Sequence, residues 1–479
     1  MQKILNFIGG EMREPIGGRY FETDDPSVGK PYALVPDSGA EDLERAVAAA
    51  KKAFPAWRDT PAAERAKAMH RLADLIEKNQ DAFARAESID NGRPVAGCAA
   101  VNIARGSANL RFFADEGVKF AGGKFKTGKI ESYTLPQPLG VVATISPWNL
   151  PMLLFTWKFA PALAAGNCVI AKPSEITPMT AYMLSGLAND AGIPAGVLGV
   201  LHGKGADIGA AITRHPDIPA ISFTGGTVTG RTIYAGAAQQ LKKVSLELGG
   251  KNPTIVFDDA DLYKAAEGAI AAGFSNQGQI CLCGSRLLVQ EKIYNEFKRL
   301  FVASAKEIKI GDPLLAETQH GPMVSKAHME KVLSYIDLAQ QEGGKILAGG
   351  QRHIVDGRCK DGWFIAPTVI EGLPMDCRTN QEEIFGPVVT IMPFKTEEEA
   401  VALANGVEYG LAASVWTQDR EKADRVSAQI ESGIVWQNCW NVRDLHTPFG
   451  GVKKSGVGRE GGRRALEFFT EEKTVSRIA

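Results

Sequence analysis

Cys281 stands in a sequence context that suits nucleophilic chemistry. It ends the run Phe274-Ser-Asn-Gln-Gly-Gln-Ile-Cys281, whose small and flexible residues can present a sulfur atom to a ligand. A thiolate is the strongest common side-chain nucleophile near neutral pH. Taken alone, however, an isolated cysteine is more often a buried structural residue. A second chemical group is therefore needed to support a catalytic interpretation.

A carboxylate upstream could be the partner of this thiol. Glu247 opens the run Glu247-Leu-Gly-Gly-Lys251. A carboxylate within reach of Cys281 could act as a general base on the thiol and on a water molecule. The alternative is a surface glutamate that closes a strand, although the Leu-Gly-Gly that follows favours a tight passage of the backbone. The fold must decide whether the two residues meet.

The elements that would position these residues predict an α/β fold. From Gly140, short apolar or β-branched runs alternate with stretches of helical length, which predicts a doubly wound parallel sheet with helices on both faces. The predicted strands of this sheet are VVATIS (141–146), NCVIAK (167–172), VLGVLH (197–202), AISFTG (220–225) and KVSLEL (243–248). A second α/β domain is predicted from TIVFDD (254–259), SRLLVQ (285–290), GPVVTIMPF (386–394) and SGIVWQN (432–438).

The segments before and between these strands predict helices and an arm. Helical periodicity over residues 41–54 and 62–79 indicates that the opening third of the chain is helical. Residues 118–138 are rich in glycine and lysine, which predicts an exposed hairpin rather than core. An arm of this kind often pairs with another subunit.

The composition is that of an ordinary globular protein whose partners are small molecules or copies of itself. Of the 479 residues, 44% are hydrophobic and 23% are charged, and the formal net charge is −1. This balance gives no field that would attract nucleic acid or an anionic membrane. No signal peptide and no apolar run of spanning length is found. We therefore expect a cytoplasmic protein with no nucleic-acid and no membrane partner.

The seven cysteines predict neither a disulfide scaffold nor a structural metal. Cys281-Leu-Cys283 is C-x-C rather than C-x-x-C, and no second pair or histidine cluster lies at zinc-finger spacing. A reducing compartment fits this pattern, and we assign Cys283 no role.

Several independent motifs resemble those of the aldehyde dehydrogenase superfamily. They occur in the family's order and with similar spacing along nearly the whole chain. They are Pro147-Trp148-Asn149, Lys172-Pro-Ser-Glu175, Phe223-Thr-Gly225, Glu247-Leu-Gly-Gly, Asn-Gln-Gly-Gln-x-Cys281, Glu383-Ile-Phe385-Gly-Pro and Pro448-Phe-Gly-Gly-x-Lys-x-Ser-Gly. A chance match to all of them is not credible. The resemblance implies a non-acylating aldehyde dehydrogenase that oxidises an aldehyde to a carboxylic acid.

The resemblance also implies the catalytic roles. Cys281 would attack the aldehyde to form a thiohemiacetal, and the Asn149 amide and the Cys281 backbone N–H would meet the developing oxyanion. The product is a thioester, and Glu247 matches the general base that activates water to hydrolyse it. Because acylating relatives generally lack this glutamate, hydrolysis is favoured over transfer to coenzyme A.

The cofactor implied by the resemblance is NAD, with NADP less favoured. Lys172 and Glu175 match residues that hold the adenosine ribose, where a carboxylate would repel a 2′-phosphate. The pyrophosphate would meet the turn that contains Gly226, where many relatives have serine. Glu383 and Phe385 match the pair that grips the nicotinamide ribose, with loop capping as the alternative for Glu383. The complete expected set is Ile145, Pro147, Trp148, Lys172, Glu175, Gly205, Gly209, Phe223, Thr224, Gly225, Gly226, Leu248, Glu383 and Phe385.

The substrate expected from the resemblance is an acidic semialdehyde. The segments Arg111-Phe-Phe-Ala-Asp, Trp440-Asn-Val-Arg443-Asp-Leu and Val457-Gly-Arg459-Glu-Gly-Gly are similar to the branch that contains 2-aminomuconate and 2-hydroxymuconate semialdehyde dehydrogenases of aromatic-ring catabolism. Paired arginines could hold the distant carboxylate, so we expect Arg111 and Arg459 as its anchors. For Arg111, an ordinary surface pair with Asp115 is the alternative. Oxidation of betaine aldehyde or of a broad range of aldehydes is the second possibility, and a catalytically idle binding protein is the third.

The domains follow from the same comparison. We expect an NAD-binding domain from residues 1–117 and 139–249 and a catalytic domain from residues 250–446. Residues 118–138 and 447–479 would form an oligomerisation arm and a C-terminal segment. The tail Glu472-Lys-Thr-Val-Ser-Arg-Ile resembles the family's last strand, which pairs across subunits, so a homodimer or a homotetramer is expected.

Overall fold

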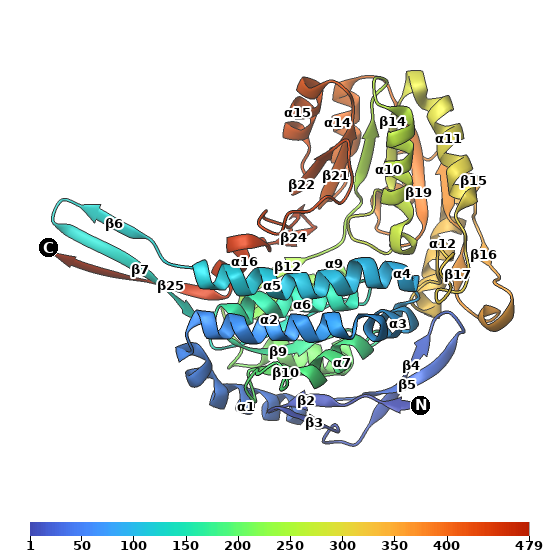
Figure 1. Cartoon of the computed structure of the whole chain (residues 1–479). Coiled ribbons are helices and arrows are strands. Elements are labelled where there is room, and N and C mark those ends of the chain that lie inside the picture. Colours follow the sequence, from blue (N-terminus) through green and yellow to red (C-terminus); the bar gives the residue numbers. More distant parts are fainter. Residues whose placement is uncertain (479) are drawn as a thin grey trace.

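The computed structural model describes residues 1–478 and consists of two α/β lobes with a projecting arm (Figure 1). The lower lobe is built on an eight-stranded sheet and the upper lobe on a seven-stranded sheet. The class predicted from the alternating strands and helices is confirmed.

The eight-stranded sheet contains all five strands predicted between residues 141 and 248. Its order is β24 (Gly456–Val457), β12 (Lys243–Glu247), β11 (Ala220–Thr224), β8 (Val141–Ile145), β9 (Cys168–Lys172), β10 (Leu198–Val200), β2 (Asn6–Ile8) and β3 (Glu11–Arg13). The five central strands run parallel, and the edge strands β24, β2 and β3 are antiparallel to their neighbours. Chain order reverses between β8 and β11, and ligands bind at such a switch point in open α/β sheets.

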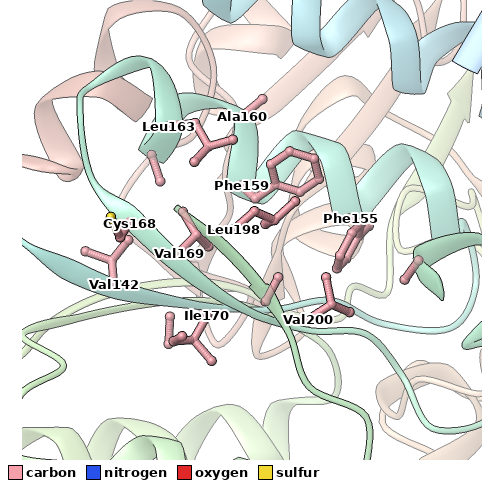
Figure 2. Packing of buried hydrophobic residues seen from close by; sticks show 14 of the residues in the cluster. Val142, Phe155, Phe159, Ala160, Leu163, Cys168, Val169, Ile170, Leu198 and Val200 are labelled. Carbon is pink, nitrogen blue, oxygen red and sulfur yellow. The ribbon is translucent and has the colours of Figure 1, made fainter. Parts of the chain in front are cut away.

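The core of this lobe lies between the sheet and α6 (Pro151–Ala164), which is apolar over most of its surface (Figure 2). Phe155, Phe159 and Leu163 point onto Val142, Val169 and Leu198 of the strands, and all six are buried. Truncating such a phenylalanine to alanine costs about 3–5 kcal/mol of stability. This packing fixes where α6 begins, and therefore where the loop before it stands.

The opening third of the chain differs from the helical expectation. Residues 2–36 form strands, and the segment Asn6–Ile8 adds an antiparallel edge to the main sheet. A separate sheet has the order β1 (Gln2–Lys3), β5 (Lys30–Pro36) and β4 (Tyr20–Asp25). The strands β1 to β3 have only two or three residues, too few to show a period. The longer β4 ends in two aspartates and β5 contains two prolines, residue types that are depleted in strands.

Helices cover both faces of the lower sheet. The two predicted helices are α1 (Ala40–Asp59) and α2 (Ala62–Lys78). The others are α3 (Gln80–Asn91), α4 (Val95–Gly97), α5 (Ala104–Lys119), α7 (Met179–Leu187), α8 (Ala210–Arg214), α9 (Thr227–Ala238) and α16 (Gly462–Phe468). A π-helical turn, Cys98–Ile103, joins α4 to α5.

The seven-stranded sheet confirms the second α/β unit. Its order is β15 (Lys345–Ala348), β18 (Thr368–Glu371), β19 (Val388–Phe394), β14 (Arg286–Gln290), β13 (Pro253–Val256), β21 (Ala412–Trp416) and β22 (Ile434–Gln437). Its helices are α10 (Leu262–Phe274), α11 (Tyr294–Glu307), α12 (Lys326–Gln341), α13 (Arg378–Gln381), α14 (Glu397–Asn405) and α15 (Arg420–Gln429). Two small pairs complete the lobe, β16 (Arg352–His353) with β17 (Phe364–Ile365) and β20 (Tyr409–Gly410) with β23 (Val452–Lys453).

The arm is a three-stranded sheet that projects from the lower lobe (Figure 1). It consists of β6 (Lys124–Thr127), β7 (Ile130–Pro138) and β25 (Thr470–Ile478). The last strand was expected to pair across subunits, but it pairs antiparallel with β7 of its own chain, from Thr470 with Pro138 to Ile478 with Ile130. Pairing of β25 with another subunit would have to use the edge of β25 that does not face β7.

Candidate active site

The loops at the carboxyl ends of the central strands carry the expected site residues. Pro147, Trp148 and Asn149 follow β8, and Gly225 and Gly226 follow β11. Because these two strands flank the reversal of chain order, their loops diverge and leave a crevice between them. The crevice faces the second lobe, which brings Cys281 to it.

Cys281 and Glu247 line one cavity of about 520 Å³. The cavity wall combines α5, α6, the loop before β14 and the segment 440–449. Cys281 is half-buried and Glu247 is only 3% exposed. The structure therefore brings the two residues to one site, as the catalytic interpretation requires.

The loop before Cys281 is held in an unusual conformation. Asn276 and Gln277 have φ of +50° and +58°, a region that non-glycine residues rarely adopt. The Gln277 amide donates to the carbonyl oxygens of Gly92 (3.2 Å) and Pro322 (2.9 Å), and the Asn252 amide donates to that of Cys281 (2.7 Å). These bonds fix the backbone from which the sulfur projects.

Asn149 is tied to the same loop. Its side-chain Nδ2 donates to the backbone carbonyl oxygen of Gln279 at 2.9 Å. The backbone carbonyl oxygen of Asn149 accepts from Asn276 Nδ2 at 3.1 Å. An amide nitrogen carries two hydrogens, so one remains available for an oxyanion next to Cys281. Asn149 is 4% exposed, and this burial keeps water from competing for that donor.

The pKa values of Cys281 and Glu247 are both raised. Burial, with the nearby Glu383 and Glu247 carboxylates, raises the pKa of the Cys281 thiol. Burial and the charge of Glu460 raise the pKa of Glu247 well above its usual range, against the opposing charges of Lys158, Arg459 and Arg443. Neither oxygen of Glu247 has a hydrogen-bond partner among residues 1–478. When it is ionised, Glu247 is therefore a stronger base than an exposed carboxylate and can take a proton from the thiol or from water.

A buried ion pair stands behind Glu247, and the sequence did not reveal it. Lys158 Nζ lies 2.7 Å from Glu460 Oε1 and donates to Ser222 Oγ at 3.0 Å, while Trp157 Nε1 donates to Glu460 Oε2 at 2.7 Å. Glu460 lines the cavity together with Glu247. The charges of the pair act on Glu247 in opposite directions, since Glu460 raises its pKa and Lys158 lowers it.

A second cavity of about 240 Å³ adjoins the first at Thr224, which lines both. Its other lining residues are Pro147, Trp148, Asn149, Gly225, Gly226, Gly249, His328, Lys331, Glu383 and Phe385. Trp148 and Phe385 meet edge to face, with ring centroids 5.2 Å apart. The structure therefore gathers the expected ribose-gripping and ring-packing residues around a space next to Cys281.

The carboxylate of Glu383 lies against the backbone of Gly249 and Gly250 at this cavity. Its Oε1 accepts from the Gly250 N–H at 2.9 Å, and a Cβ on Gly249 would stand 2.1 Å from its Oε2. Glycine at position 249 leaves the space that the Glu383 carboxylate occupies, and a larger residue would require that side chain to move. Burial raises the pKa of Glu383, while the Gly250 N–H and the charges of Lys331 and Lys251 oppose the shift.

The expected adenosine end lies at β9 and β10. Lys172 Nζ and the Gly205 N–H each donate to Glu175, to Oε2 and Oε1, at 3.0 Å. Burial acts to raise the pKa of Glu175, but these two partners prevail and lower it, so the carboxylate is charged. Gly205 and Gly209 are the first and last residues of a π-helical turn before α8. Ile145, Phe223 and Leu248 are buried supports of the strand ends.

The residues present fit a dinucleotide. Gly226 precedes α9 without a side chain to cap it, and a Cβ there would meet nothing within 4 Å. The helix N-terminus is thus open to an anion such as pyrophosphate. The hydroxyl of Thr224, which lines the cavity, is buried without a partner among residues 1–478.

The two expected substrate anchors lie elsewhere, which corrects the sequence interpretation. Arg111 lies on the outer face of α5, where its Nη2 is 2.6 Å from Asp74 Oδ1 and 2.8 Å from Glu77 Oε2. It does not pair with Asp115, which contacts His70 instead. Arg459 donates to the carbonyl oxygens of Gly451 (2.9 Å) and Gly458 (2.7 Å) and lines only a small cavity behind Glu247.

Three other arginines line the cavity of Cys281. They are Arg93, Arg105 and Arg443. None of them has a carboxylate within 4.0 Å among residues 1–478. Arg443 lies over the rings of Phe449 (4.0 Å) and Trp157 (5.2 Å), and the charge of Arg105 contributes to the lowering of the pKa of Arg443 to about 10, after burial. The cavity is therefore set up to receive an anion.

The fold and the site define a dehydrogenase that works through a covalent bond to cysteine, with a dinucleotide crevice opposite the thiol. The sequence profile of the aldehyde dehydrogenase family matches residues 13–475. The chain is 45% identical to 2-aminomuconic semialdehyde dehydrogenase of Mus musculus over 477 residues, 99% of this chain and 98% of that protein. It is also 45% identical to 2-hydroxymuconic semialdehyde dehydrogenase of Pseudomonas sp. (strain CF600), with 99% of each chain covered.

Solved structures agree with this comparison. An aldehyde dehydrogenase from Bacillus cereus, solved as an NAD+ complex, superposes with a TM-score of 0.97 at 40% identity and covers 100% of this chain and 97% of that chain. The protein belongs to the aldehyde dehydrogenase family and is an enzyme of that class.

Within residues 1–478, no helix is both long and apolar enough to cross a membrane. Over the same range, no group of three or more His, Cys, Asp or Glu side chains is arranged to hold a metal ion.

Proposed function

We propose that this enzyme oxidises a muconate-type semialdehyde, such as 2-aminomuconate or 2-hydroxymuconate semialdehyde, to the dicarboxylic acid with NAD. One observation carries the proposal: Arg105 and Arg443 line the cavity of Cys281 without carboxylate partners. The names of the two relatives point to the same class of substrate.

The positions of three residues support the following reaction. Glu247 takes the thiol proton as the Cys281 sulfur bonds to the aldehyde carbon, and the oxyanion of the thiohemiacetal accepts from Asn149 Nδ2 and the Cys281 N–H. NAD, when bound in the crevice, supplies the hydride acceptor. Glu247 then releases the thiol proton to solvent and, ionised again, takes a proton from water, which attacks the thioester carbon and breaks the C–S bond. The carboxylic acid leaves, and the proton taken from water passes from Glu247 to the departing sulfur, which restores the thiol.

The arginines select the substrate. A guanidinium holds a carboxylate with paired, charge-assisted hydrogen bonds, and two arginines with no protein partner make that pairing favourable. A cationic substrate such as betaine aldehyde would meet repulsion in the same cavity. A small neutral aldehyde would leave both guanidinium groups unpaired, so it would bind more weakly.

The proposal is tested by the initial rate of NADH formation with 2-hydroxymuconate semialdehyde, benzaldehyde, a straight-chain aldehyde and betaine aldehyde, each with NAD and with NADP. The expected result is the highest kcat/KM with the muconate semialdehyde and NAD. A preference for a neutral aldehyde or betaine aldehyde would refute the substrate assignment. Cys281→Ala should abolish turnover while NAD still binds, and retained turnover would refute the mechanism.

The arm supports a homo-oligomer, a homodimer or a homotetramer. Phe125, Ile130, Tyr133, Leu135 and Ile478 are apolar, belong to the arm and are 37–82% exposed. Apolar side chains gathered on a projecting sheet favour burial against another chain. Light scattering of the whole protein and of a Phe125→Ser/Leu135→Ser variant tests this, since a monomeric wild type would refute it. We also propose a cytoplasmic location, which fractionation of the native source would test.

The domain division stays part of the proposal, with residues 1–117 and 139–249 for NAD and 250–446 for catalysis. The C-terminal segment 447–479 contributes to all three parts: β23 pairs with β20, β24 extends the lower sheet and β25 joins the arm.

A further inference from the structure

Arg93 lies apart from the other two cavity arginines. The charge of Arg105 acts on Arg443, whereas Arg93 precedes the continuous helical run of α4, the π-helical turn and α5, in which Arg105 lies. Along the cavity wall, Arg93 and Arg105 are separated by the small or short side chains of Ala100, Val101 and Ala104. A ligand held at Arg105 and Arg443 therefore leaves Arg93 free for another group.

The wall between these arginines has an irregular backbone. Ala100 and Val101 belong to the π-helical turn Cys98–Ile103, and Val101 is 44% exposed. Such turns are rare and occur frequently at functional sites. An exposed valine on a turn that faces a cavity offers an apolar surface for the carbon skeleton of a ligand.

The guanidinium of Arg93 is held in place but is not saturated. Nη1 donates to Asn102 Oδ1 at 2.9 Å, while Nε and Nη2 have no hydrogen-bond partner within residues 1–478. The backbone of the same residue is fixed, since its N–H donates to Asn91 Oδ1 (2.9 Å) and its carbonyl oxygen accepts from Ser88 Oγ (2.7 Å). A fixed guanidinium with free N–H groups loses little entropy on binding an anion.

Glu87 does not neutralise the charge of Arg93. Glu87 accepts from the Met152 N–H at 2.9 Å and from Asn102 Nδ2, so both of its oxygens are engaged. Burial raises the pKa of Glu87 to about 7, which weakens its negative charge near neutral pH. No ion pair joins the two groups among the described residues. The charge of Arg93 is left for a ligand.

We infer that Arg93 forms a second anion subsite of the substrate cavity, so that the preferred substrate is a semialdehyde with two carboxylates. One carboxylate binds at Arg105 and Arg443, and the other binds at Arg93 across the wall of Ala100, Val101 and Ala104. This inference rests on the proposed function and narrows its substrate class.

The loop that carries Arg93 is hydrogen-bonded to active-site residues. Asn91 Nδ2 donates to the carbonyl oxygen of Asn149 at 3.3 Å, and the Gly92 carbonyl oxygen accepts from Gln277. A change at Arg93 that moves this loop would lower turnover of every substrate. The informative quantity is therefore the ratio of kcat/KM between two semialdehydes.

The experiment compares a muconate-type semialdehyde with one carboxylate and the same skeleton with an added carboxymethyl group, in the wild-type enzyme with NAD. The dicarboxylate is expected to have the higher kcat/KM, by at least about tenfold for a charge-assisted pair. Arg93→Gln keeps a donor for Asn102 but loses the charge, and it should reduce this ratio by at least about tenfold, with KM affected more than kcat. Arg93→Lys should restore part of the ratio.

Arg111→Gln is the matched control, because Arg111 is an arginine of the same region that does not line the cavity. It should leave the ratio unchanged. A wild-type preference for the monocarboxylate, or the same ratio in Arg93→Gln, would overturn the second subsite while the proposed function stands. If the enzyme turned over only neutral aldehydes, both the second subsite and the proposed function would be refuted.

Discussion

The side-chain amide of Asn149 is hydrogen-bonded to the carbonyl oxygen of Gln279, two residues before Cys281, at 2.9 Å. Asn149 precedes α6 in the lower lobe, and Gln279 follows α10 in the upper lobe. The bond therefore joins the two lobes at the reaction centre. It aligns the expected oxyanion donor with the nucleophile before any substrate binds, which is the condition for electrostatic stabilisation of a transition state.

Loss of this donor should slow the chemistry more than binding. Asn149→Ala is expected to lower kcat by about 10²–10³-fold, equivalent to about 2.7–4 kcal/mol of transition-state stabilisation. Steady-state kinetics with NAD and the acidic semialdehyde measures the effect. Labelling of the Cys281 thiol at the wild-type rate would show that the loop is intact, and an unchanged kcat would remove Asn149 from the mechanism.

Removal of the buried base should trap the covalent intermediate. Glu247→Gln keeps the size of the side chain but cannot accept a proton, so hydrolysis of the thioester should slow by about 10²–10⁴-fold. Mass spectrometry after mixing with NAD and semialdehyde should show the acyl group on Cys281. A variant that turns over normally without an adduct would show that another group activates water.

The two inner arginines should matter only for acidic substrates. Arg105→Met and Arg443→Met should each raise KM for the muconate semialdehyde by at least about tenfold, because each removes a charge-assisted partner of its carboxylate. The KM for benzaldehyde should change far less. Arg111→Met, on the outer face, is the control, and an equal effect of all three variants would contradict the assignment.

The acid limb of the rate profile should respond to Glu460. The base works when Glu247 is ionised, and burial followed by the charge of Glu460 raises the pKa of Glu247, so activity falls as the pH drops through that raised value. Glu460→Gln removes the negative charge and leaves Lys158 unpaired, and both changes lower the pKa of Glu247. The acid limb of kcat should therefore move to lower pH. The exposed Glu64→Gln variant should leave it in place, and movement to higher pH would exclude this coupling.

Cofactor choice should depend on Glu175. Its carboxylate is charged and held by Lys172 and the Gly205 N–H, so it would repel a 2′-phosphate. Glu175→Ser is expected to improve the kcat/KM for NADP relative to NAD by at least about tenfold. Binding of each cofactor, measured by quenching of tryptophan fluorescence, should change in the same direction. No change in the ratio would mean that another feature excludes the phosphate.

Local sequence features predicted the parts of the fold and site that depend on neighbours in the chain. The five central strands of the lower sheet are short apolar runs between helical stretches, and each forms where the pattern predicts it. The resemblance identified Cys281, Glu247 and Asn149, and the structure places them around adjoining cavities. Three of the N-terminal strands were missed because two or three residues do not establish a period, and the longer β4 and β5 were missed because they contain aspartates or prolines, which are depleted in strands.

Only the tertiary structure decided which arginines face the reaction. Arg105 and Arg111 both lie on α5, but at 3.6 residues per turn they point about 120° apart around the helix axis. The sequence suggested Arg111, whereas the packing of α5 against α6 turns Arg105 toward Cys281 and leaves Arg111 with Asp74 and Glu77. The sequence thus determined the chemistry, because the motifs around the nucleophile and the base resemble those of a known family and can be read from the chain itself. The direction of a charged side chain depends on which helix face is buried, and that is settled only when distant segments pack together.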